Sequence, residues 1–219
     1  MLIRKYYLTL QLTSCLMKRI LVTGFEPFGD YAENSSWAVA ERVAARGVCD
    51  ADVVVEPLPV SYRRVSQVLR DAVARHSPDA IILLGQSALS DRVKLERVAL
   101  NLMDATRGDN DGYAPDEEPI DPNSDAALFT ALPIKRLHRA IAERNVAVKI
   151  SNSCGLYVCN RTYFEALSIC REQRSAISAI FVHLPLFEGQ ASANPNAHTM
   201  PIEDMTLAVE TIIGEVIKL

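Results

Sequence analysis

The chain has 219 residues, of which 49% are hydrophobic, and this is enough to bury one substantial core of the size usual for a single α/β domain. The formal net charge of −4 is mild, and no block of Lys and Arg is interleaved with aromatic residues, so the composition excludes nucleic acid as a partner. No apolar run reaches the roughly 18 residues of a membrane span, and we expect no membrane partner.

The first sixteen residues place two basic side chains before a semi-apolar stretch that is interrupted by Gln11, Thr13 and Ser14. Such polar residues are atypical of a secretory signal. We interpret residues 1–16 as a disordered leader or a misassigned start, and residues 17–219 as a single domain.

Short β-branched runs then alternate with helical periodicities, which is typical of a parallel sheet covered by helices on both faces. The expected strands are Arg19–Thr23, Val53–Leu58, Ala80–Leu84, Val146–Ser151 and Ala179–His183. The expected helices are Tyr62–His76, a segment opened by Pro133, Val158–Gln173 and Pro201–Lys218. The pattern predicts an α/β protein, a three-layer α/β/α sandwich with a mostly parallel, twisted central sheet. Residues Arg107–Ser124, rich in Asp, Asn, Gly and Pro, are expected to form a long loop of the kind that often serves function.

Unusual segments follow several of the predicted strands. They are Gly24–Gly29 (GFEPFG), Gly85–Gln86, Ser151–Asn160 (SNSCGLYVCN) and His183. Because ligands bind at the carboxyl ends of the strands in open parallel sheets, we expect these segments to gather around one site.

The cysteines form an odd, irregularly spaced set, which does not suit a disulfide scaffold in a chain of this size. They are Cys15, Cys49, Cys154, Cys159 and Cys170. We therefore expect a reducing, cytoplasmic compartment. Cys154 and Cys159 lack the second pair or the adjacent histidine of a metal site, so we expect neither a metal nor another cofactor.

Cys159 is the best candidate for a nucleophile, because free N–H groups and the dipole at the start of the expected helix stabilise a thiolate. His183 is the histidine placed at a strand end, where it could take the proton. Glu96, an acid in an apolar segment, could orient the imidazole. Each has an ordinary alternative: a buried structural thiol, a satisfied core histidine, or a surface ion pair with Arg97.

Motifs distributed along the chain support these choices. They are ILVTGFEPFG (Ile20–Gly29), Asn34 with Trp37, Gly85–Gln86, ERVALN (Glu96–Asn101), YVCN (Tyr157–Asn160) and FVHLP (Phe181–Pro185). In this order they resemble the motifs of pyroglutamyl peptidase type I, also called pyrrolidone carboxyl peptidase. The similarity extends from about Met17 almost to the C-terminus.

The resemblance implies a cysteine omega peptidase that hydrolyses the N-terminal 5-oxoprolyl (pyroglutamyl) residue from peptides. It implies that Cys159 attacks, that His183 serves as base and then as acid, and that Glu96 holds and charges the imidazole. It also implies a homo-oligomer, often a tetramer.

The resemblance further implies which residues contact the substrate. Phe25 and Phe28 would flank the lactam ring, although core packing is their ordinary alternative. Gln86 would contact the substrate or the oxyanion, unless its amide only stabilises a turn. Asn34 is a further candidate for substrate binding.

The chain also departs from the family pattern. Ser87–Ser90 (SALS) stands where the family has a small residue, two glycines and an arginine, and Cys154 stands where alanine is common. Arg107 is displaced by one position, which redirects the fixed donors of a guanidinium. One alternative is therefore a non-catalytic or altered-specificity member, with the site remodelled around Leu89 and Thr106. A nucleoside- or nucleotide-binding α/β protein is another, although the chain lacks the glycine-rich phosphate loops of such proteins.

Overall fold

A computed structural model describes residues 17–173, 177–193 and 198–219 of the chain. The leader or misassigned start that we expect at residues 1–16 lies outside the described residues. The strands are β1 (Lys18–Phe25), β2 (Ala51–Leu58), β3 (Ala80–Gln86), β4 (Val93–Glu96), β5 (Val98–Leu100), β6 (Ala127–Phe129), β7 (Val148–Ser151) and β8 (Ser178–Leu184). The helices are α1 (Ser35–Arg46), α2 (Val65–His76), α3 (Ile134–Glu143), α4 (Val158–Glu172), α5 (Ile202–Val216) and the 3₁₀-helix Glu188–Ala193.

The central sheet has the strand order β2-β1-β3-β8-β4-β7. β1 pairs in parallel with β2 and β3, and β3 pairs in parallel with β8. β4 is antiparallel to β8, and β7 is parallel to β4, so these two strands run against the others. β5 and β6 form a separate antiparallel pair. The expected mostly parallel sheet is confirmed.

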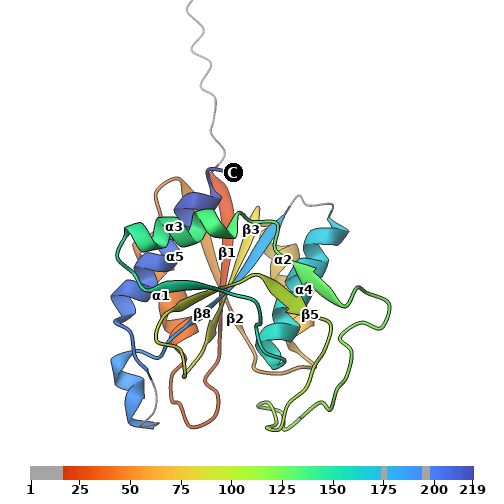
Figure 1. Cartoon of the computed structure of the whole chain (residues 1–219). Coiled ribbons are helices and arrows are strands. Elements are labelled where there is room, and N and C mark those ends of the chain that lie inside the picture. The colour runs from red at the N-terminus through yellow and green to blue at the C-terminus, as the bar shows by residue number, and fades with distance from the viewer. Residues whose placement is uncertain (1–16, 174–176, 194–197) are drawn as a thin grey trace, which may run out of the picture.

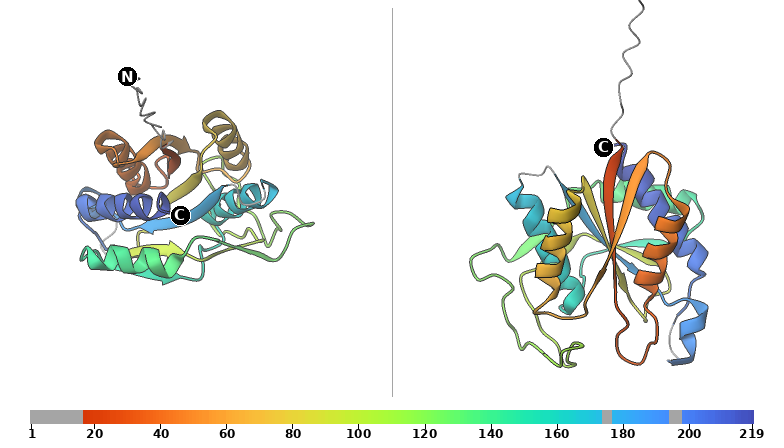
Figure 2. Two further views of the ribbon diagram at one scale, coloured as in Figure 1. Left: turned by 90° about the horizontal axis from the view of Figure 1, so that it is seen from above. Right: turned by 180° about the vertical axis from the view of Figure 1, so that it is seen from behind.

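Helices cover both faces of this sheet, which gives the expected α/β/α sandwich (Figures 1 and 2). α1, α3 and α5 pack on one face, and α2 and α4 pack on the other. Successive side chains of a strand point to opposite faces, so Ile20 and Val22 enter the first core while Leu21 enters the second. Because both faces of these strands are buried, their sequences are continuous apolar runs, and such runs predict the strands from the sequence.

Helix α1 was absent from the elements expected from the sequence. Its start is set by Asn34, whose side-chain oxygen accepts a hydrogen bond from the Ser36 N–H, and its end is set by Gly47 with φ of 70°. An Asn N-cap and a glycine with positive φ are ordinary helix boundaries. The sequence contains both boundary residues, but the apolar residues between them follow the helical repeat only weakly.

The direction of β7 corrects a second expectation. We expected its carboxyl end to lie with those of the other strands, but β7 runs against β8, and its last residue, Ser151, pairs with Glu96 of β4. Residues 152–157 then carry the chain to α4. Cys159 reaches the edge where β3 and β8 end because α4 begins there, and the end of β7 does not place it.

The long loop expected between Arg107 and Ser124 lies between β5 and β6, where residues 101–126 contain an isolated bridge but no assigned helix or strand. It is tied to the loops that follow β1 and β2. Oε1 of Glu26 accepts hydrogen bonds from the Val60 N–H and from Nδ2 of Asn110, each at 2.9 Å. Figure 1 shows the three loops together at the lower edge of the sheet.

Candidate active site

Cys159 is the second residue of α4, and it is partly exposed. No side chain caps the N-terminus of this helix. Asn160, which is fully buried, fixes the first turn, because its side chain accepts from the Leu100 N–H at 2.9 Å and donates to the carbonyl oxygens of Leu100 and Leu102. The N–H groups and the dipole of this helix end favour negative charge on the Cys159 sulfur.

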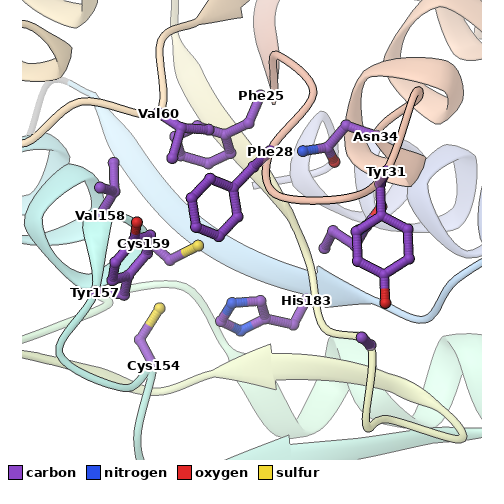
Figure 3. Close-up of a pocket in the computed structure, with 12 residues that line it drawn as sticks. Phe25, Phe28, Tyr31, Asn34, Val60, Cys154, Tyr157, Val158, Cys159 and His183 are labelled. Atoms are coloured by element: carbon purple, nitrogen blue, oxygen red, sulfur yellow. The ribbon is translucent and has the colours of Figure 1, made fainter. Parts of the chain in front are cut away.

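His183 and Glu96 form a buried pair on adjacent strands. Nδ1 of His183 lies 2.8 Å from Oε1 of Glu96, and the Glu96 side chain has no exposed surface. Their strands are antiparallel, with Glu96 opposite Phe181, so residues 181 and 183 share the face that carries Glu96. Because Nδ1 is engaged by the carboxylate, Nε2 is the nitrogen left for the thiol. Figure 3 shows the imidazole beside the Cys159 sulfur.

The surroundings of His183 favour the imidazolium. Burial alone would lower its pKa, but hydrogen bonds with Cys159 and with the Glu96 carboxylate outweigh burial and raise the pKa from 6.5 to about 9. The imidazole is therefore charged at neutral pH, next to a sulfur at a helix N-terminus.

Gly85, at the end of β3, makes room for this arrangement. A Cβ atom there would lie 2.6 Å from Cζ of the Phe181 ring and 3.2 Å from Sγ of Cys159. The first distance is far below a van der Waals contact, so a larger residue would displace the ring or the sulfur. Sequence reasoning singled out this glycine as part of a turn, whereas its role here is to let a side chain approach the sheet.

A cavity of about 280 Å³ opens beside the thiol and the imidazole. Its lining residues are Phe25, Phe28, Tyr31, Asn34, Val60, Gln86, Ala88, Cys154, Tyr157, Val158, Cys159 and His183. Figure 3 shows the Phe25 and Phe28 side chains close to the Cys159 side chain. Mostly apolar walls with few polar groups are typical of a pocket for a small, uncharged group.

Gln86 lines this cavity with an amide whose orientation is fixed. Its Oε1 accepts from the Ser35 N–H and from Nε2 of Gln190, both at 2.8 Å. Because two donors hold the oxygen, Nε2 of Gln86 is the group that remains to donate.

Asn34 also lines the cavity, but its amide is engaged by protein groups. Oδ1 accepts from the Ser36 N–H and hydroxyl, and Nδ2 donates to the carbonyl oxygen of Glu26 at 2.9 Å. The side chain is 7% exposed. Its contacts are those of a helix cap that also holds the loop after β1.

Arg107 and Ser87–Ser90, where the chain departs from the family pattern, lie beside the cavity. The Arg107 guanidinium stands 5.0 Å from the centre of the Phe28 ring, within the range of a cation–π contact. Ala88 lines the cavity, and the next residue, Leu89, is 74% exposed. Arg107 therefore packs on a wall of the cavity, on the outside of Phe28.

Some lining residues escaped sequence reasoning. Tyr31 and Val60 lie in loops, and no local sequence pattern predicts that they line the cavity. Tyr157 belongs to a quoted motif, but its place opposite Phe28, with ring centres 5.3 Å apart, arises only from tertiary packing. Cys154 stands where alanine is common in the family, and its side chain lines the cavity.

A thiol at a helix N-terminus, an imidazole and a buried carboxylate on an α/β/α fold belong to the class of cysteine-dependent acyl-transfer enzymes. The model of the pyroglutamyl peptidase family matches residues 18–218. The chain belongs to this family. The pyrrolidone-carboxylate peptidase of Thermococcus onnurineus (strain NA1) is 36% identical over 200 residues, covering 91% of this chain and 99% of that protein.

Solved structures agree with this assignment. The crystal structure of pyroglutamyl peptidase I from Bacillus amyloliquefaciens has a TM-score of 0.88 and 31% identity, covering 92% of this chain and 96% of that one. Pyrrolidone carboxyl peptidase from Fervidobacterium islandicum AW-1 has a TM-score of 0.88 and 30% identity, covering 92% and 99%. The family indicated by the motifs is confirmed, and the nucleotide-binding alternative gains no support.

Within the described ranges, no helix is long and apolar enough to cross a membrane. Over the same residues, no group of three or more His, Cys, Asp or Glu side chains is placed to hold a metal ion.

Proposed function

We propose that this protein is a cysteine omega peptidase that hydrolyses the N-terminal 5-oxoprolyl residue from peptides, with Cys159 as nucleophile, His183 as base and acid, and Glu96 as the group that orients and charges the imidazole. The observation that supports it best is the 2.8 Å contact between Nδ1 of His183 and Oε1 of Glu96, beside a cavity that the Cys159 side chain also lines.

The proposed reaction is an acyl transfer in two halves. The Cys159 thiolate attacks the 5-oxoprolyl carbonyl carbon, and the His183 imidazolium gives its proton to the nitrogen of the departing amine. Water, deprotonated by the now neutral His183, then attacks the thioester and releases 5-oxoproline. N–H groups in the first turn of α4 stabilise the oxyanion, and each well-placed donor contributes about 3 kcal/mol.

The cavity suits the lactam ring in shape and charge. Phe25 and Phe28 offer apolar surface to a ring that carries no charged amino group. Nε2 of Gln86 is a donor for a carbonyl oxygen of the substrate, because its amide oxygen is held by Ser35 and Gln190. Asn34 contributes to the same wall mainly by fixing the backbone around it.

Hydrolysis of a fluorogenic 5-oxoprolyl amide tests the proposal. Turnover should vanish in Cys159→Ala and persist in Cys170→Ala, which removes a thiol of the same helix that does not line the cavity. Iodoacetamide should alkylate Cys159, and 5-oxoproline should slow that reaction. Turnover retained in Cys159→Ala, or equal turnover of the prolyl amide that lacks the lactam carbonyl, would contradict the assignment.

The setting of the enzyme is also part of the proposal. We infer a single catalytic domain over residues 17–219 that acts in the cytoplasm on peptides, without nucleic acid or membrane partners, and assembles as a homo-oligomer, a tetramer. Free thiols at Cys49, Cys154, Cys159 and Cys170 suit a reducing compartment. The resemblance of the motifs to the family supports the assembly, and the 64% exposed Phe129 is one apolar side chain that a contact between copies would cover. Light scattering coupled to size-exclusion chromatography measures the assembly, and a monomer at micromolar concentration would contradict it.

A further inference from the structure

A second thiol lies inside the candidate active site. Cys154, in the segment between β7 and α4, is 5% exposed and lines the same cavity as Cys159 and His183. Figure 3 shows the side chains of Cys154 and Cys159 reaching toward the same space, next to the imidazole. The proposed acyl transfer gives Cys154 no task, so the structure contains a buried nucleophilic group without an assigned role.

The two sulfurs differ in chemical state. Burial raises the pKa of the Cys154 thiol well above its usual range, and the negative charges of Cys159 and Glu96 raise it further. Cys154 therefore stays protonated, while Cys159 stands at a helix N-terminus beside an imidazolium. Both side chains line one cavity, so the protonated thiol faces the same space as the reactive sulfur. One reactive sulfur with a protonated thiol close by is the arrangement of a redox-sensitive cysteine and its resolving partner.

We propose that Cys154 is the resolving thiol of an oxidation site, in which a hydroperoxide converts Cys159 to a sulfenic acid and Cys154 then closes a reversible disulfide with it. The proposal depends on the thiolate that the proposed function places at Cys159. A small peroxide, such as hydrogen peroxide, is the oxidant, and the cavity that admits a lactam ring is large enough to admit it.

Both steps balance. The Cys159 thiolate attacks one peroxide oxygen, the S–O bond forms as the O–O bond breaks, and the departing oxygen takes the proton of the His183 imidazolium to leave as water or an alcohol. The Cys154 sulfur then attacks the Cys159 sulfur, so that the S–S bond forms, the S–O bond breaks, and water leaves with the proton from Cys154. The sulfurs together lose two electrons, which the peroxide gains.

The backbone between the two cysteines can adjust to close the bond. A disulfide requires Cα atoms about 4.4–6.8 Å apart. Gly155, with φ of 76°, lies directly after Cys154 and provides a flexible backbone position next to it. The bonds that hold this segment are long, such as Gly155 N–H to Ser153 Oγ at 3.3 Å and Tyr62 hydroxyl to the Leu156 carbonyl at 3.2 Å. The hydrogen bonds shown for residues 153–156 are all 3.1 Å or longer, so this segment can shift while the 2.9 Å bonds of Tyr157 and Asn160 hold the start of α4 in place.

Oxidation alters activity in a way that Cys154 determines. With Cys154 present, the oxidised nucleophile is stored as a disulfide that a thiol reductant restores. Without it, Cys159 remains a sulfenic acid and further peroxide takes it to sulfinic acid, which thiols do not reduce. Cys154 thus protects the nucleophile and makes its inactivation reversible.

Mass spectrometry of the full-length protein tests this directly. Trypsin cleaves after Lys149 and Arg161, so one peptide carries both cysteines and no other. After treatment with hydrogen peroxide and alkylation of free thiols, the wild-type peptide should be unalkylated and lighter by two hydrogens, and dithiothreitol should reverse this. Chymotryptic cleavage after Tyr157 should leave the two halves joined until reduction.

The variants separate the outcomes. In Cys154→Ala and Cys154→Ser, the peptide should gain two oxygens at Cys159, and reductant should no longer recover hydrolysis, while Cys170→Ala should recover as the wild type does. Alanine and serine are both small, and thermal unfolding verifies that each variant is folded. A wild-type peptide with both thiols alkylated, or equal recovery in all variants, overturns the proposal. The mass readout stands even if the 5-oxoprolyl amide is not hydrolysed, so it separates failure of this inference from failure of the proposed function.

Discussion

Glu96 is the residue on which the charge of the site depends. Its Oε1 is bonded to His183, and within the described part of the chain its buried Oε2 has no hydrogen-bond partner. A buried carboxylate without a compensating charge is costly, so a proton on the imidazole stabilises both groups. Glu96 therefore does more than orient the imidazole. Its carboxylate keeps a proton on His183, and this is the proton that the leaving amine needs.

We expect Glu96→Gln to lower kcat/KM for a 5-oxoprolyl amide by about 10²–10⁴-fold. The amide keeps the size of the side chain but removes the charge that helps to raise the pKa of His183 to about 9. Since a histidine is protonated below its pKa, a lower pKa moves the alkaline limb of the pH–rate profile to lower pH. Profiles of kcat/KM from neutral to alkaline pH measure the shift.

Glu165→Gln is the matched control for that experiment. Glu165 is also a buried carboxylate, on α4, and it pairs with Arg161 at 3.0 Å instead of with the imidazole. This variant should lose stability but keep the alkaline limb of the wild type. An unmoved limb in Glu96→Gln would contradict the role assigned to the carboxylate.

Gly85→Ala should damage both the fold and the site. The added methyl group meets the Phe181 ring at 2.6 Å and the Cys159 sulfur at 3.2 Å, and neither neighbour is the flexible end of an exposed side chain. We expect the free energy of unfolding to fall by about 1–3 kcal/mol, as for other overpacked cores. Because the sulfur is displaced, kcat should fall as well. Urea unfolding and turnover of the same preparation check the two effects.

Gly214→Ala supplies the opposite case. A Cβ atom at Gly214, inside α5, meets nothing within 4 Å. Replacing a glycine in a helix interior by alanine should stabilise the protein by about 0.5–1 kcal/mol and leave turnover unchanged. Equal effects of the two substitutions would mean that the close contacts at Gly85 do not matter.

At the level of elements, the long loop between β5 and β6 completes the cavity through one buried acid. Asp109 is 6% exposed and accepts hydrogen bonds from the N–H groups of Tyr62, Asp111 and Tyr113 at 2.8–2.9 Å. The carbonyl oxygen of the neighbouring Gly108 accepts from the Tyr157 hydroxyl at 2.9 Å. The loop thereby holds the aromatic side chain that packs against Phe28.

Asp109→Asn should therefore act mainly on substrate binding. An amide nitrogen cannot accept one of the three bonds, which costs about 1–3 kcal/mol in a buried place. We expect KM for the 5-oxoprolyl amide to rise about tenfold with a smaller change in kcat, since about 1.4 kcal/mol of binding energy corresponds to tenfold. Asp116→Asn, an exposed position of the same loop, is the control. A fall in kcat at constant KM would place the effect on Cys159 or His183 instead.

Local patterns in the sequence predicted the elements whose signal is local. Apolar runs predicted β1, β2, β3 and β8, and the helices α2, α3, α4 and α5 were also predicted from the sequence. The short strand β4 and the direction of β7 were not predicted, because strand direction depends on which distant partners pair, and such pairing leaves no local pattern. The same holds for the site: Cys159 and His183 lie in elements that the sequence predicts, whereas Val60 is held at the cavity by tertiary hydrogen bonds to Glu26 and Asn110.

At the level of the whole molecule, the polar residues of the candidate active site adjoin one of the two apolar cores, the one that lies between the sheet and helices α2 and α4. Phe181 belongs to the core shared by α2 and α4, and it packs 4.8 Å from the His183 ring, two residues further along β8. The imidazole is therefore continuous with the packing of this core. Its protonation is for that reason linked to global stability and not only to catalysis.

The pH dependence of unfolding tests this link. His183 has an ordinary pKa of 6.5 and a pKa of about 9 in the folded protein, so the folded state binds the proton more tightly. The resulting stabilisation is fully present below pH 6.5 and is lost as the pH rises toward about 9. We expect the wild type to lose about 1–3 kcal/mol of unfolding free energy over this range by urea titration. His183→Gln should flatten that slope, whereas His138→Gln on α3, which does not line the cavity, should keep it. If unfolding free energy depended on pH equally in all three proteins, the charged imidazole would contribute nothing to stability. The charge of the buried Glu96 carboxylate would then have to be balanced by another group.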